Sequence, residues 1–218
     1  MAGGTTPRLE YDRSVFINCP FDPAYQPLFA AVIFTIQYSG FFARSALEVS
    51  DGSRTRLATL CELIAGCRYG IHDLSRTSLD QTHGLPRMNM PFELGLFLGC
   101  QRYGSGRHQR KASLILDSEP YRYQKFLSDI AGQDSLAHGD DPKTVILHVR
   151  NWLRTAAKLT HLAGGEAMWA EFQLFQRDLP TIARSLQLTP AELTFVDYRH
   201  IIGTWQQQRD PSRTLERL

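Results

Sequence analysis

The sequence lacks most of the features that identify secreted, membrane or metal-binding proteins. Its four cysteines form neither a CxxC pair nor a tight Cys/His spacing, and no signal peptide precedes them. Free thiols in a reducing compartment are therefore expected, which predicts a cytoplasmic location. No apolar run approaches the roughly 20 residues that span a bilayer, so no membrane partner is expected.

An excess of charge of one sign is also missing. The chain has 24 Lys and Arg residues against 22 Asp and Glu residues, a formal net charge of +2, and the two signs are interspersed. This pattern predicts no nucleic-acid partner, although it is compatible with a small anionic ligand. The seven histidines form no HExxH pattern and the acids form no calcium loop. No metal site is therefore predicted.

What is present is an alternation of strand and helix patterns. Short apolar segments predict strands, and apolar residues at helical spacing predict helices between them. Strands are predicted at residues 14–18, 41–47, 69–73 and 112–116, and the apolar stripes of helices at 28–36, 57–64, 92–100 and 145–153. Short connections of this kind imply parallel pairing with right-handed crossovers, so we predict an α/β fold with a flavodoxin-like open parallel sheet.

The two ends of the chain differ from this core. Residues 1–13 begin with a Gly- and Thr-rich stretch and are expected to be a flexible leader, whereas residues 14–163 form the predicted α/β domain. Residues 164–218 carry no strand pattern and predict a helical C-terminal appendage. Its helices are predicted at residues 167–179, from Pro190 onward behind a Thr189 cap, and at 198–207. The aromatic residues of this appendage either pack on the core or form a contact in a homo-oligomer.

Open parallel sheets bind ligands outside the carboxyl ends of their strands, so the candidate site is expected at that edge. The residues expected there are Asn18, Cys19, Pro20, Phe21 and Asp22 after the first strand, Arg54 at the start of the second helix, Asp73, Ser75 and Arg76 after the third strand, and Asn89 and Glu93 at the start of the following helix.

Glu93 is the most unusual of these acids, because it lies between Phe92 and Leu94 in a mostly apolar helix. Such a carboxylate is either functional or structural. In the structural case it accepts hydrogen bonds from backbone N–H groups at the start of the helix and gains ~0.3–1 kcal/mol from the helix dipole. Asp73 has a similar pair of interpretations, since it could accept sugar hydroxyls or cap the following turn. The residues alone leave both questions open.

Three further residues have a simple structural interpretation. His72 should point to the face of the sheet opposite Asp73, because side chains alternate along a strand, and we predict a packed core histidine. Arg54 could meet a phosphate or make a surface ion pair. Cys19 has no His or Asn at a spacing that would support a nucleophile, so a buried inert thiol is expected.

Three motifs together resemble the TIR-like and nucleoside 2-deoxyribosyltransferase-like superfamily. They are SVFINCPFD at 14–22, IHDLSR at 71–76 and NMPFELGLFLG at 89–99, and similar bacterial sequences carry the CPFD, IHDLSR and PFELG parts. The resemblance covers roughly residues 15–116 and implies a TIR-like sheet with a nucleotide pocket lined by a strand-end acid and a later glutamate. Asp73 and Glu93 match those positions. The CPFD loop and the long helical tail depart from a standard TIR domain.

The TIR branch implies an NAD+ nucleosidase that cleaves the nicotinamide-ribose bond by hydrolysis, cyclisation or ADP-ribosyl transfer, often in antiphage defence. NAD, or a related nucleotide, would be the substrate, and no cofactor is implied. Glu93 would be the catalytic residue, and Asp73 would support the sugar. The loop from Asn18 to Asp22 and Arg54 would contact phosphate or adenine.

Two alternatives remain at this stage. The deoxyribosyltransferase branch implies an N-glycosidase or base exchange on nucleosides or nucleotides, and the departure of ordinary bases usually benefits from a proton donor. Nicotinamide leaves without one, and a single clear carboxylate, Glu93, therefore favours NAD. The other alternative is a non-catalytic nucleotide-sensing or interaction module in which Glu93 is structural.

Overall fold

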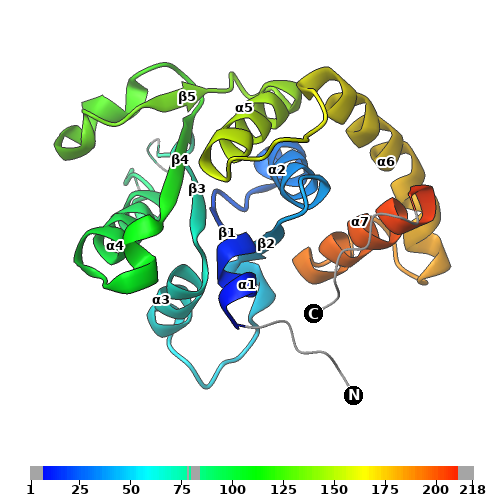
Figure 1. The fold of residues 1–218 in the computed structure, drawn as a ribbon, viewed down its shortest axis with the longest axis horizontal. Coiled ribbons are helices and arrows are strands. Elements are labelled where there is room, and N and C mark those ends of the chain that lie inside the picture. Colours follow the sequence, from blue (N-terminus) through cyan, green and yellow to red (C-terminus); the bar gives the residue numbers. More distant parts are fainter. Residues whose placement is uncertain (1–6, 78, 80–83, 211–218) are drawn as a thin grey trace.

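The computed structural model describes residues 7–77, 79 and 84–210, and it contains the expected open parallel sheet (Figure 1). The strands are β1 (Ser14–Asn18), β2 (Phe42–Ser45), β3 (Tyr69–Asp73), β4 (Ala112–Asp117) and β5 (Ser135–Ala137). All neighbours pair in parallel, in the order β2-β1-β3-β4-β5, which is the flavodoxin-like order. The order reverses between β1 and β3, and ligands bind these sheets at such a switch point.

Helices cover both faces of the sheet (Figure 1). Helices α2 (Gln26–Tyr38) and α5 (Pro142–Ala156) cover one face, whereas α3 (Arg56–Gly66) and α4 (Asn89–Tyr103) cover the other. Strands β1 and β3 are buried at every position because they lie between both layers. The predicted cap of α5 is confirmed: the Asp141 carboxylate accepts from the backbone N–H groups of Lys143 and Thr144, and Pro142 follows it.

The C-terminal helices α6 (Gly165–Ser185) and α7 (Phe195–Arg209) pack against α2 on its side away from the sheet (Figure 1). Phe34 of α2 is the centre of this contact, with ring centroids 5.3 Å from Phe172, 5.5 Å from Phe175 and 6.0 Å from Trp205. These residues belong to the same apolar cluster as the central strands. The helical appendage therefore extends the core of the α/β domain.

Several predictions at element boundaries were wrong. Residues 7–13 form helix α1 (Pro7–Arg13) where a leader was expected, and β2 is shorter than the predicted strand. Residues 190–194 form turns, and α7 starts at Phe195 behind a Thr194 capping box with Asp197, so no helix begins at Pro190. Strand β5 was not predicted because only three residues form it. Short 3-10 helices complete the fold: η1 (Pro23–Tyr25), η2 (Ala46–Glu48), η3 (Gly106–Arg110), η4 (Arg122–Lys125) and η5 (Ser128–Ile130).

A shared core predicts that the whole chain unfolds as one unit. Ile202 is fully buried in α7, so Ile202→Val should lower the free energy of unfolding by about 0.5–1.5 kcal/mol. In urea, far-ultraviolet circular dichroism of the whole chain and fluorescence of the tryptophans in α5, α6 and α7 should shift together. Val196→Ala on the exposed side of α7 is the control, with an expected change below about 0.5 kcal/mol. Two separate transitions would contradict a common core.

Candidate functional site

The switch point between β1 and β3 brings the predicted polar residues together. Asn18 ends β1, and its side-chain amide donates to the Met90 carbonyl oxygen at 2.8 Å and to His72 Nδ1 at 3.0 Å. Both amide hydrogens are therefore used inside the protein. Asn18 thus fixes the first turn of α4, the helix that carries Glu93, against the end of β1.

His72 is fully buried, as predicted, on the face of the sheet opposite the Asp73 carboxylate. Its ring packs 5.0 Å from Phe97 and 6.1 Å from Phe16, measured between ring centroids. Burial, with a smaller effect of the Lys111 charge, lowers the pKa of His72 to about 3. The imidazole is consequently neutral at physiological pH, and it accepts at Nδ1 from Asn18.

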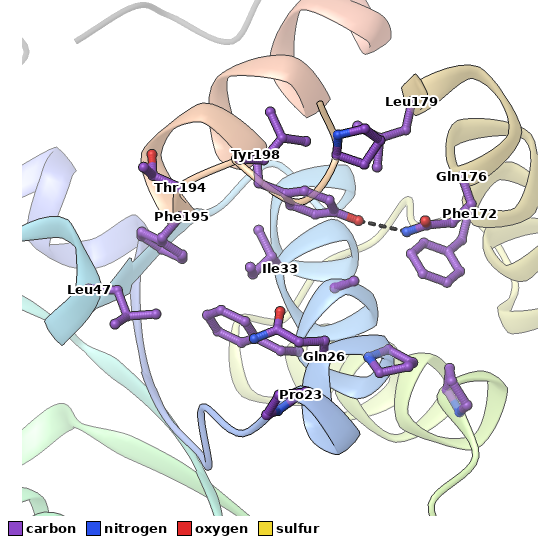
Figure 2. A pocket seen from close by; sticks show the side chains of 16 residues that line it. Pro23, Gln26, Ile33, Leu47, Phe172, Gln176, Leu179, Thr194, Phe195 and Tyr198 are labelled. Atoms are coloured by element: carbon purple, nitrogen blue, oxygen red, sulfur yellow. Dashed lines mark hydrogen bonds between the residues drawn. The ribbon is translucent and has the colours of Figure 1, made fainter. Parts of the chain in front are cut away.

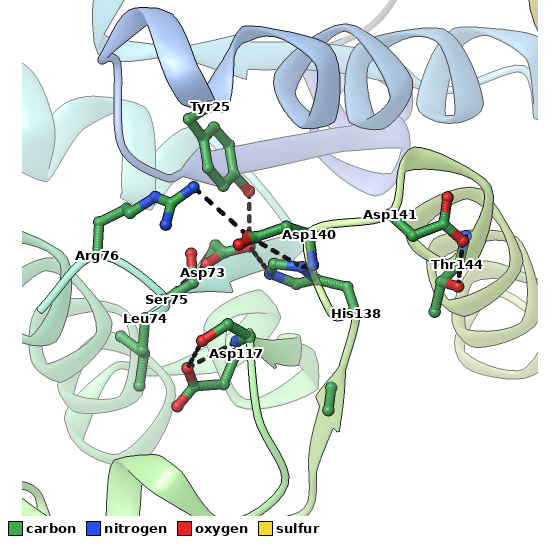
Figure 3. A network of polar contacts seen from close by, with 12 residues as sticks. Tyr25, Asp73, Leu74, Ser75, Arg76, Asp117, His138, Asp140, Asp141 and Thr144 are labelled. Carbon is green, nitrogen blue, oxygen red and sulfur yellow. Dashed lines mark hydrogen bonds and ion pairs between the residues drawn. The ribbon is translucent and has the colours of Figure 1, made fainter.

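Asp73 is the centre of a buried polar network (Figure 3). Its Oδ2 accepts from the Tyr25 hydroxyl at 2.6 Å and lies 3.0 Å from His138 Nε2, while Oδ1 accepts from the Ser75 backbone N–H at 2.8 Å. His138 Nδ1 accepts from the Asp140 backbone N–H at 3.0 Å, and Nε2, the other ring nitrogen, faces Asp73. Both carboxylate oxygens are therefore occupied.

The balance of burial and hydrogen bonding sets the charge of Asp73. Burial raises its pKa, but the hydrogen bonds and charge of His138, together with the hydrogen bonds from Ser75 and Tyr25, outweigh it and leave the pKa below the usual value. Asp73 is fully buried, so its carboxylate has no surface open to a ligand. What it does in this structure is hold η1 and the loop after β5 to the end of β3.

Sequence reasoning did not find Tyr25 or His138. Tyr25 lies in η1, within the turn that follows the Cys19–Asp22 loop, and Asp22 positions it by accepting from its backbone N–H at 3.1 Å. His138 directly follows β5, the strand that was too short to predict. The one sequence signal for either residue was the position of Tyr25, directly after a Pro-rich turn at the end of β1.

Glu93 has a very different environment from Asp73. It is only 8% exposed, and within the described part of the chain its carboxylate makes no hydrogen bond or ion pair. Burial raises the pKa of Glu93 to about 7, and the positive charge of Arg56 opposes this effect only in part. Burial thus moves the titration of Glu93 from the acidic range toward neutral pH. If Glu93 were only a helix-start residue, backbone N–H groups of α4 should donate to its carboxylate, and no such hydrogen bond is observed among the described residues.

Cys19 lies in the field of both carboxylates. Burial raises the pKa of its thiol well above the usual value, and the negative charges of Asp73, Glu93 and Asp22 raise it further, in that order. The thiol is thus protonated and 3% exposed, in agreement with the predicted buried inert cysteine.

The other predicted residues of the β1 and β3 ends lie around this centre. Pro20 is buried, and the Phe21 ring packs 5.6 Å from Phe29. The Ser75 hydroxyl is buried and makes no hydrogen bond within the described residues, while the Ser75 backbone N–H donates to Asp73. Arg76 forms an ion pair with Asp140 at 3.5 Å, next to the Asp73 network (Figure 3). Asn89 is exposed at the first position of α4.

Arg54 lies farther out, beyond the carboxyl end of β2. Its guanidinium pairs with Glu62 on the exposed side of α3, with one N–O distance of 2.7 Å. Arg54 and Arg56 nevertheless line one cavity of about 270 Å³ together with the loop that joins η2 to α3. Arg56, which lines this cavity, is also the positive charge that lowers the pKa of Glu93, so its side chain lies within electrostatic range of that carboxylate.

Comparisons with known proteins add no functional assignment. No protein-family model matches the chain, and neither the curated proteins nor the solved structures gave a match. Within the described residues, no helix is both long enough and apolar enough to cross a membrane. The same part of the chain contains no group of three or more His, Cys, Asp or Glu residues arranged to hold a metal ion.

Proposed function

We propose that this protein cleaves the N-glycosidic bond between nicotinamide and ribose in NAD, with Glu93 as the catalytic carboxylate. One observation carries the proposal. At the switch point of the sheet, Glu93 is a buried carboxylate without a described partner, and its pKa is raised to about 7. Strongly perturbed acids in such positions are characteristic of functional sites.

Glu93 suits a reaction in which positive charge develops on a sugar. The bond from the anomeric carbon to the pyridinium nitrogen breaks, and its electron pair leaves with neutral nicotinamide. The ribose becomes oxocarbenium-like, which an ionised carboxylate stabilises. Water then adds to the anomeric carbon and loses a proton, giving ADP-ribose. No general acid is required at any point of the bond cleavage.

Asp73 explains why a reaction with a single carboxylate is favoured. Its oxygens face Tyr25, His138 and the Ser75 backbone N–H, and the carboxylate is fully buried, so it offers the substrate neither a proton nor an accessible oxygen. Its proposed role is to fix the turn that follows the Asn18–Asp22 loop.

The cavity beside α3 is the proposed place for the anionic part of the substrate, because its lining has two arginines against one carboxylate, Asp51. Arg54 and Arg56 both line it, and its volume of about 270 Å³ is smaller than a whole dinucleotide requires. Arginine presents several donors in a planar fork that matches phosphate oxygens. We therefore place the diphosphate of NAD there, with the nicotinamide ribose at Glu93.

The second candidate is an N-glycosidase or deoxyribosyltransferase that acts on nucleosides or nucleotides. The same pKa supports it, because a glutamate with a pKa of about 7 is partly protonated at neutral pH and could donate a proton to a departing base. A nucleotide-binding module without turnover is the third candidate, and it needs no particular charge on Glu93.

The pH dependence of cleavage separates these candidates. If ionised Glu93 stabilises the sugar cation of NAD, nicotinamide release should rise about tenfold for each pH unit below 7 and level off above it. Chromatography of the products from pH 5.5 to 8.5, at high protein concentration, measures this profile. Cleavage of a nucleoside that instead falls as the pH rises through 7 would establish Glu93 as a general acid. NAD that binds without nicotinamide release at any of these pH values would contradict the enzymatic proposal.

A further inference from the structure

A second cavity lies between α2, α6 and α7 (Figure 2). Its volume is about 790 Å³, within the usual range of small-molecule sites. Its apolar walls come from Phe29 and Ile33 of α2, Phe172 and Leu179 of α6, and Leu193 and Phe195 at the start of α7. Neither Glu93 nor any residue that lines the cavity beside α3 lines this one, although Pro23 at its edge directly follows the Asn18–Asp22 loop.

Prolines and a stacked pair of aromatic rings restrict the conformation of the elements that line this cavity. Four prolines line it, and three of them, Pro23, Pro27 and Pro142, stand in the first turns of η1, α2 and α5. A proline at such a position has a fixed φ and lacks a backbone N–H that could close onto a neighbour. The rings of Phe29 and Phe195 stack with centroids 5.9 Å apart. These contacts hold the helices in place around the opening without filling it.

The lining determines the charge of an occupant. None of its described residues is Asp, Glu, Lys, Arg or His. A charged group buried here would lose its hydration without gaining a counter-ion, which is costly. A peptide strand would also fit poorly, because it brings an N–H and a C=O with each residue, whereas the lining offers few polar side chains. The occupant is therefore neutral and mostly apolar.

One polar group on the lining has a free hydrogen. Gln176 Nε2 donates to the Tyr198 hydroxyl oxygen at 2.7 Å, so the ends of the two side chains meet in the lining of the cavity (Figure 2). The hydroxyl hydrogen of Tyr198 has no acceptor among the described residues. Tyr198 is half-buried, and burial raises its pKa well above the usual value, so this hydrogen stays in place. An occupant that carries an acceptor would satisfy it.

We propose that this cavity binds a neutral, mostly apolar small molecule whose carbonyl or ether oxygen accepts a hydrogen bond from Tyr198. The size of the cavity, its uncharged lining and the free hydroxyl hydrogen each support one part of this description. The site does not depend on cleavage of NAD, so it stands or falls separately from the function of Glu93.

Binding can be tested with two neutral fluorescent probes on the full chain. Prodan is a naphthalene ketone and has a carbonyl acceptor, whereas N-phenyl-naphthylamine is of similar size without one. We expect saturable binding of both probes with one site per chain. Tyr198→Phe should weaken prodan about fivefold, the loss of one hydrogen bond, and should leave N-phenyl-naphthylamine unchanged.

A cavity-filling variant with a matched control locates the probe. Ala30 lines the cavity, so Ala30→Phe should weaken both probes at least about tenfold, whereas Ala170→Phe on the exposed side of α6 should have no effect. Gln26→Trp, at an exposed position of the same lining, provides a second filling variant should Ala30→Phe disturb the fold. Circular dichroism checks the fold of each variant.

Two results would overturn the proposal. The first is no saturable binding of either probe, or equal binding by wild type and both filling variants. The second is a wild-type dimer, detected by light scattering, that Ala30→Phe dissociates, because the cavity would then be a contact between two copies of the chain.

Discussion

Replacing Glu93 by glutamine is expected to reduce nicotinamide release from NAD by about 10²–10³-fold. Glutamine keeps the shape of the side chain but removes the charge that stabilises the oxocarbenium-like ribose. Because the carboxylate has no described hydrogen-bond partner, its removal disturbs no internal bond of the described structure. The loss should therefore appear in the rate of turnover and not in folding.

The free energy of unfolding of Glu93→Gln should rise at pH 8, although its turnover falls. The folded-state pKa of Glu93 is raised from 4.5 to about 7, so the unfolded chain releases the proton at lower pH than the folded chain. The stability associated with the protonated acid is complete below about pH 4.5 and is lost as the pH rises through 7. Since part of the carboxylate still contacts water, the cost above pH 7 is on the order of 2 kcal/mol. Glu93→Gln should recover much of it at pH 8.

The matched control is Glu119→Gln, an exposed acid after β4, which should keep both rate and stability. Rates come from chromatography of nicotinamide, and stability from urea unfolding at pH 5 and pH 8. A Glu93→Gln enzyme with normal turnover would contradict the catalytic role. A variant less stable than wild type at pH 8 would show that the carboxylate has a structural partner.

The sheet could be predicted from the sequence because its central strands are buried on both faces. A strand such as Ser14–Asn18 or Tyr69–Asp73 must then be a short, mostly apolar segment. The helices beside it must carry a stripe of apolar residues at helical spacing. The failures have a common cause. Helix α1 and strand β5 are short, with seven and three residues, and contacts elsewhere in the chain stabilise them more than their own pattern does.

The candidate site could be predicted only at the level of location. Strand ends place Asn18, Asp73 and the helix of Glu93 at one edge, and that follows from parallel topology. The topology does not predict which of the two acids, Asp73 or Glu93, has hydrogen-bond partners inside the protein. The Asp73 carboxylate contacts Tyr25 and His138, which come from distant parts of the chain. Tyr25 precedes Asp73 by 48 residues, and His138 follows it by 65. Such pairings depend on tertiary packing, which periodicity does not encode.

Asp73→Ala is expected to lower the free energy of unfolding by about 3–5 kcal/mol, the usual cost of removing one member of a buried charged network. The Tyr25 hydroxyl, His138 Nε2 and the Ser75 N–H would all lose their acceptor in a place without solvent. Tyr25→Phe removes one donor only, so a loss near 1 kcal/mol is expected for it. Asp129→Ala, at an exposed position, is the control for loss of a carboxylate.

The pH dependence of this loss identifies the ionised state of Asp73. Its folded-state pKa lies below the usual value, so the stability that it contributes is present above pH 3.8 and is lost as the pH falls through the folded-state pKa. Urea unfolding of wild type and Asp73→Ala should accordingly differ most at neutral pH and converge in acid. A difference that instead grows as the pH falls would mean that the folded-state pKa of Asp73 is raised and that this acid is neutral in the folded protein. That result would contradict the ionised Asp73 on which the assignment of Glu93 as the single working carboxylate rests.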